Sequence, residues 1–147
     1  MPDAVEVSLK HLAENADAIV EARVSTPARE MRQELTDDGC GGFAVQVYHL
    51  DVLTIRVSPT GVPLPAQVDA YDPTGWIDGM ARHATCVHAT PDVKTTSFYD
   101  TPITWGPGKE LVVFLDWDGT RWLFTSHDAF DDVNRADKAT RWAGVKQ

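Results

Sequence analysis

One stretch of alternating apolar residues, Phe43–Val57, limits the folds open to this chain more than any other feature. Its apolar positions occupy one strand face at first and then the opposite face: Phe43, Val45 and Val47, followed by Tyr48, Leu50 and Val52. A strand that exchanges its buried face midway needs a bulge or a sharp bend. Strands of this kind are typical of small curled barrels, so we expect a mostly-β fold.

A second strong signal is the dipeptide Asp118-Gly119 between two apolar runs, Leu111–Trp117 and Thr120–Phe124. Asp-Gly favours the two-residue type I′ turn of a β-hairpin. That turn predicts four cross-strand pairs: Trp117 with Thr120, Asp116 with Arg121, Leu115 with Trp122, and Val113 with Phe124. Both faces of this hairpin carry apolar residues, so we expect other elements to cover both sides.

Shorter elements are predicted around these two signals. A helix with Ser8 as its N-cap and one apolar face comes first, and an alternating strand over residues 17–24 follows it. A long polar connection then covers residues 29–42, and a further strand covers residues 66–71.

The segment 72–108 shows no clear strand pattern and contains four of the nine prolines. We expect a long connection with one short helix around residues 77–84. The end of the chain, residues 128–147, favours a C-terminal helix or tail that begins at Asp128. The length of 147 residues fits a single domain, residues 1–147, with a sizeable core.

Charge excludes two classes of partner. Thirteen basic residues against twenty-two acidic ones give a net charge of −9. Nucleic acids and anionic membranes repel such a surface, whereas a partner with a basic rim is attracted to it. The chain also has no apolar stretch near the ~20 residues of a membrane-spanning helix. We therefore expect no nucleic-acid partner and no membrane insertion.

Two segments resemble a known family. Ala16–Val24 joins the first helix to a strand, and Gly106–Leu115 ends in a buried strand. Their order resembles that of bacterial envelope proteins with the tissue-inhibitor-of-metalloprotease-like (netrin-like) OB-fold. The resemblance covers the early and late thirds of the chain. It implies a mostly-β, five-stranded, OB-like curled barrel with a short N-terminal helix, the long 72–108 connection and a C-terminal helix or tail.

The resemblance also has departures. Ala22 stands where the family usually has glycine, and no cysteine lies near Met1 to direct an amino group at a protease zinc. It therefore implies a fold and an exported location, extracellular or periplasmic as a mature segment, but no activity. A cytoplasmic location is the alternative, because the N-terminus lacks the basic and apolar regions of a secretory signal.

The two cysteines, Cys40 and Cys86, suit either two buried thiols or one disulfide. The resemblance to envelope proteins favours the bridge. Cys86 also lies between His83 and His88, and thiolate and imidazole are good zinc ligands. The spacing matches no standard zinc pattern, so a loop with surface histidines is the alternative to a metal site. We predict no cofactor, with zinc, or calcium at the acidic groups, as the alternatives.

Two of the five tryptophans, Trp76 and Trp105, lie in the 72–108 segment beside glycine or proline. An exposed aromatic side chain there could anchor a protein partner. The other interpretation, which we favour, is that both side chains pin the segment to the rest of the fold.

These observations favour a non-enzymatic binding module that contacts an unidentified protein partner through its barrel loops, in an inhibitor-like or adaptor-like role. A second hypothesis is a zinc-binding protein or metal-dependent enzyme that uses His83, Cys86 and His88. A third is a structural component of the envelope.

Overall fold

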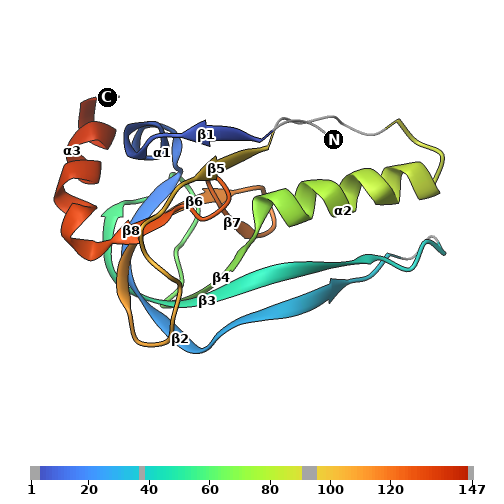
Figure 1. The fold of residues 1–147 in the computed structure, drawn as a ribbon, viewed down its shortest axis with the longest axis horizontal. Helices are drawn as coiled ribbons and strands as arrows, with labels where there is room; N and C mark the ends of the chain where they lie inside the picture. Colours follow the sequence, from blue (N-terminus) through green and yellow to red (C-terminus); the bar gives the residue numbers. More distant parts are fainter. Residues whose placement is uncertain (1–3, 37–38, 91–95, 146–147) are drawn as a thin grey trace.

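The computed structural model describes residues 4–36, 39–90 and 96–145 (Figure 1). The elements follow one another in this order: β1 (Val5–Val7), α1 (Leu9–Asn15), β2 (Ala18–Glu34), β3 (Phe43–Val57), β4 (Gln67–Tyr71), α2 (Pro73–Cys86), β5 (Ser97–Tyr99), β6 (Glu110–Trp117), β7 (Trp122–Phe124), β8 (Phe130–Asp132), a 3-10 turn (Val133–Arg135) and α3 (Ala136–Val145). In the described part of the chain, no helix has both the length and the apolar character needed to cross a bilayer.

The main sheet curls into a ring. Its strand order is β2-β3-β4-β7-β6-β8, and β2 also pairs with β6, which closes a ring of five strands. β4 and β7 run parallel, and the other neighbouring pairs of the ring are antiparallel. The predicted mostly-β fold, with five strands in a curled arrangement, is therefore confirmed. β1 and β5 form a separate parallel pair.

β3 exchanges its buried face because two apolar clusters cover opposite faces of the strand. In its first half, Phe43, Val45 and Val47 form a small cluster with Tyr71, and Trp76 of α2 packs against it. In its second half, Tyr48 and Leu50 point into the larger core inside the ring. The predicted exchange is confirmed, and its cause is a second core beneath α2.

The largest bulge between β2 and β3 lies in β2, while two smaller bulges in β3 leave Leu53 and Arg56 without an opposite residue. Val24 pairs with Leu50 and Arg29 with Tyr48, so the four residues 25–28 stand opposite a single residue of β3. Beyond this bulge, β2 continues to Glu34, and the predicted polar connection over 29–42 is wrong for residues 29–34. This half of β2 has few buried positions, so its side chains show no apolar alternation.

α2 begins earlier than predicted, at Pro73. Asp72 caps it, since its carboxylate accepts a hydrogen bond from the N–H of Gly75 at 3.3 Å. Proline suits the first turn of a helix because its missing N–H would have no partner there. Gly75 and Gly79 lower the helical propensity of the segment and shortened the helix predicted from sequence. α2 lies along the second half of β2 and the first half of β3, which extend away from the ring (Figure 1).

The predicted register of the β6–β7 hairpin is wrong by two residues. Leu115 pairs with Phe124, and Trp117 pairs with Trp122. A four-residue turn replaces the two-residue turn, because the Asp118 carboxylate accepts hydrogen bonds from two backbone N–H groups within the turn, both at 2.8 Å. Arg121 consequently pairs with Asp118 at 3.2 Å and not with Asp116.

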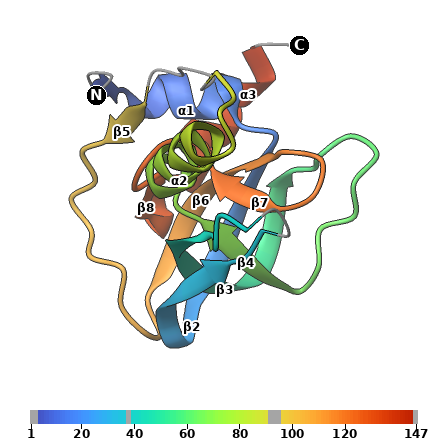
Figure 2. The same cartoon turned by 90° about the vertical axis from the view of Figure 1, so that its right-hand side faces the viewer.

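α1 and α3 lie side by side at one end of the ring (Figure 1, Figure 2). The Ser8 hydroxyl caps α1 by accepting from the N–H of His11 at 3.1 Å, as predicted. The C-terminal helix is confirmed, but it begins at Ala136 and not at Asp128. Asp128 has a φ of 56°, which is incompatible with a helical start, and β8 follows it.

Candidate functional site

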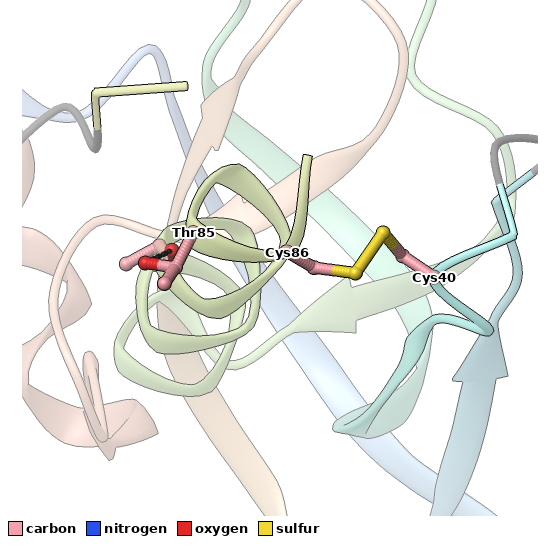
Figure 3. Close-up of a disulfide and its surroundings, with 4 residues drawn as sticks. Cys40, Thr85 and Cys86 are labelled. Atoms are coloured by element: carbon pink, nitrogen blue, oxygen red, sulfur yellow. Dashed lines mark hydrogen bonds between the residues drawn. A yellow bond between two sulfur atoms is a disulfide. The ribbon is translucent and has the colours of Figure 1, made fainter. Parts of the chain in front are cut away.

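The structure does not bring His83, Cys86 and His88 together as a metal-ligand set. Cys86 lies at the end of α2 and is disulfide-bonded to Cys40 in the segment between β2 and β3 (Figure 3). The predicted bridge is thus present, and a bridged sulfur is not a thiolate that can bind zinc. In the residues that the structure describes, no group of three or more His, Cys, Asp or Glu side chains is placed to hold a metal.

Trp105 lies inside the ring and is not available to a partner as an exposed anchor. The side chain is 5% exposed. Its ring contacts those of Tyr48, Phe124 and Phe130, with centroid separations of 5.3, 5.6 and 5.0 Å. The indole N–H donates to the carbonyl of Ala28 at 2.9 Å. Trp105 therefore pins the segment before β6 to the core, as the favoured interpretation of its sequence position predicted.

Trp76 has a different environment on the first turn of α2. It makes edge-to-face contacts with Phe43 and Tyr71, at centroid separations of 5.3 and 5.7 Å. The guanidinium of Arg121 lies 3.9 Å from the centre of its ring. The indole thus ties α2 to the sheet, but it stays half-buried and faces a groove.

This groove, which we call the Trp76 groove, lies between the start of α2 and the β6–β7 hairpin. It has a volume of about 550 Å³. Its apolar walls come from both elements: Pro73, Trp76, Ile77, Trp117, Leu123 and Phe124. Its polar positions are mostly acidic: Asp17, Asp116, Asp118 and Thr125. The groove therefore combines aromatic surface with three carboxylates.

Backbone and hydroxyl groups hold two of these carboxylates in place. The N–H of Trp117 donates to the Asp17 carboxylate at 2.9 Å. The Asp116 carboxylate accepts from the N–H of Asp17 at 3.2 Å and from the hydroxyl of Thr125 at 3.1 Å. These contacts join the residue just before β2 to the hairpin, so the acidic groups have defined positions in the groove.

A second polar cluster lies on the outer face of β2, β3 and β4. Arg32 donates to Asp69 at 3.1 Å and to Glu30 at 2.5 Å, and the His49 ring contacts Asp69 at 2.7 Å. Burial opposes ionisation of Asp69, but the hydrogen bonds from His49 and Arg32 outweigh it and lower the pKa of that carboxyl. Arg32 also donates to Tyr71 at 3.3 Å. The cluster is a network of mutual partners, which suits a structural role.

A third cluster surrounds His127. Its ring contacts Asp72 at 2.9 Å and Asp128 at 3.4 Å. The hydrogen bond with Asp72 raises the pKa of His127, although burial opposes this shift. The hydroxyl of Ser126 donates to the backbone carbonyl of His127 at 3.2 Å, so Ser126, His127 and Asp128 do not form a catalytic triad. The cluster links the cap of α2 to the turn before β8.

The sequence pattern indicates Trp76 but not its partners in the groove. Asp17 and Trp117 are separated by 100 positions and meet only because β2 pairs with β6. A local pattern carries no signal for such a contact. Comparisons with models of known protein families and with curated protein sequences found no match, so the chemistry of the groove itself is the basis for assigning a role.

Proposed function

We propose that this protein is an exported, non-enzymatic binding module that holds a basic segment of another protein in the Trp76 groove. The observation that carries this proposal is the placement of Trp76 and Trp117 beside Asp17, Asp116 and Asp118. Lysine and arginine combine an apolar stem with a cationic head, and arginine also stacks on aromatic rings. A groove with both surfaces suits such side chains.

Arg121 provides an internal example of this chemistry. Its guanidinium stacks on Trp76 and pairs with Asp118 at 3.2 Å. A partner arginine would find an equivalent combination at Trp117, where Asp17 and Asp116 lie. The net charge of −9 adds a long-range attraction that accelerates encounter with a basic partner.

The proposed location is extracellular or periplasmic. A bridge between Cys40 and Cys86 suits an oxidising compartment, since cytosolic thiols are kept reduced. The resemblance to envelope proteins of the netrin-like OB-fold supports the same location. A protein that binds a partner without catalysing a reaction can have an inhibitor-like or an adaptor-like role.

The proposal is tested by titrating a short arginine-rich peptide into isotope-labelled protein and following the indole N–H resonances by NMR. We expect the resonances of Trp76 and Trp117 to shift, while those of Trp105 and Trp142 stay in place because Trp105 is buried and Trp142 lies on α3. Replacing both Asp17 and Asp116 by asparagine should weaken binding by about 2- to 10-fold.

The matched control is Asp137→Asn on α3, which removes a negative charge from a side chain that is 79% exposed and does not line the groove. If it weakens binding as much as Asp17→Asn or Asp116→Asn alone, net charge alone explains the affinity and the groove is not the site. Unshifted resonances of Trp76 and Trp117 at saturating peptide would also contradict the proposal.

A further inference from the structure

One edge of β2 is open over residues 29–34. On one side this segment pairs with β3 in unbroken register, from Arg29 opposite Tyr48 to Glu34 opposite Phe43. On the other side β6 covers β2 only over residues 18–23. Among the strands of the described chain, none pairs with this second edge of residues 29–34, which forms the margin of the sheet (Figure 1).

This edge lacks two common protections against strand addition. Edges are often blocked by proline or by a bulge. Here Pro27 and the bulge both precede the open segment, and the register after Arg29 is regular. Met31 is 62% exposed and Leu35 is 77% exposed, so apolar surface lies along the same edge.

The charges of the segment are complementary to a second copy of itself. Arg29, Glu30, Arg32 and Glu34 sum to zero, in a chain whose net charge is −9. If two copies pair antiparallel about a twofold axis at Met31, Glu30 of each copy lies opposite Arg32 of the other. Met31 then lies against its own counterpart. An axis at Arg32 would instead place two arginines opposite each other, which is unfavourable.

The segment is also held rigidly before any association. Arg32 donates to Asp69 at 3.1 Å and to Tyr71 at 3.3 Å, both on β4. The Cys40–Cys86 disulfide ties the far end of β2 and β3 to α2. A strand that is already ordered loses little conformational entropy when it pairs, so a short interface can suffice for a weak dimer.

We propose that the protein forms a homodimer by antiparallel pairing of residues 29–33 of β2 about a twofold axis at Met31. A second copy of the chain is the partner at this edge, because the charges of the segment are complementary to those of a second copy that runs antiparallel to it. This interface shares no residue with the Trp76 groove, so the two proposals stand or fall separately.

Sedimentation velocity over a range of concentrations tests the association. We expect a concentration-dependent dimer of two 16.2 kDa chains. Met31→Lys places two ammonium groups opposite each other and should raise the dissociation constant about fivefold or more. Leu53→Lys is the matched control, because Leu53 is 43% exposed on β3 and lies outside the interface, and it should leave the dimer intact.

Cysteine cross-linking tests the register. Directly opposed residues have Cβ atoms about 4.5–5.5 Å apart, so Met31→Cys should cross-link to its counterpart under mild oxidation. Gln33→Cys should cross-link far more slowly, because Gln33 lies opposite Arg29 of the second copy. Equal cross-linking of the two variants, or a monomer at every concentration, would overturn the proposal. An unrelated peptide bound at this edge without self-association would also overturn it.

Discussion

The ring and the arm of this molecule are stabilised in different ways. The arm consists of α2 with residues 29–34 of β2 and residues 43–47 of β3. The strands of the ring carry large side chains that are almost completely buried, such as Phe114 and Phe124. The arm is held by a small apolar cluster of Phe43, Val45 and Val47 with Tyr71 of β4. A disulfide and a polar network stabilise it further. A two-stranded extension buries too little apolar surface to be stable alone, so it depends on a helix and cross-links.

The largest effect should come from the ring. Phe114→Ala removes a fully buried side chain and should lower the free energy of unfolding by about 3–5 kcal/mol, because it leaves a cavity in the core. Urea unfolding measures this loss. Phe43→Ala in the arm should cost less, and equal losses would show that the ring and the arm do not differ as described.

Removal of the disulfide should act on the arm. Replacing both Cys40 and Cys86 by serine opens a link between positions 46 residues apart, which should cost about 2–4 kcal/mol. Hydrogen exchange should show faster exchange in α2 and in residues 43–47, while β6 keeps its protection. Uniform acceleration over the whole chain would contradict a separate contribution to the arm.

Gly79 allows the packing around α2 to be compared with the packing around another helix. A Cβ on this residue of α2 would overlap the ring of Phe43. Gly79→Ala should therefore destabilise the protein by about 1–3 kcal/mol, although alanine favours helices. Gly144 on α3 has open space at the same position, so Gly144→Ala should be neutral or stabilise by up to about 1 kcal/mol. Thermal unfolding of both variants checks the opposite signs, and a stable Gly79→Ala would rule out close packing of the arm.

The smallest effect concerns the link between the ring and α2. The pKa of His127 is raised by its hydrogen bond with Asp72, so the protonated ring is favoured in the folded state. This contribution to stability is complete below the ordinary histidine pKa of about 6.5 and is lost as the pH rises through the raised value. NMR titration of the His127 ring should show the raised pKa. Asp72→Asn should lower it, and an unchanged titration would contradict the assigned cause.

Local patterns predicted the elements whose chemistry is local. The Ser8 cap and the alternation over residues 43–57 both led to the observed elements, because capping and strand alternation act within a few residues. The hairpin was located correctly but its register was not. There the Asp118 side chain satisfies the turn's own N–H groups and lengthens the turn.

The candidate site was only partly predictable. Trp76 and Trp105 have the same residue type and similar neighbours in sequence, yet one lines a groove and the other fills the core. Their environments depend on which strands surround them. Asp17 gave no local signal, since its role arises from contact with a hairpin 100 positions away.

The sequence by itself determined that this chain is mostly β, acidic, curled around a strand that uses both faces, and equipped with two cysteines. Those properties follow from composition and short-range periodicity. Only the tertiary structure decided that Cys40 meets Cys86, that β2 runs on to Glu34 with an open edge, and that Trp117 and three aspartates line one groove with Trp76. Such contacts join distant segments, and their energies depend on strand pairing and packing, which no local pattern encodes.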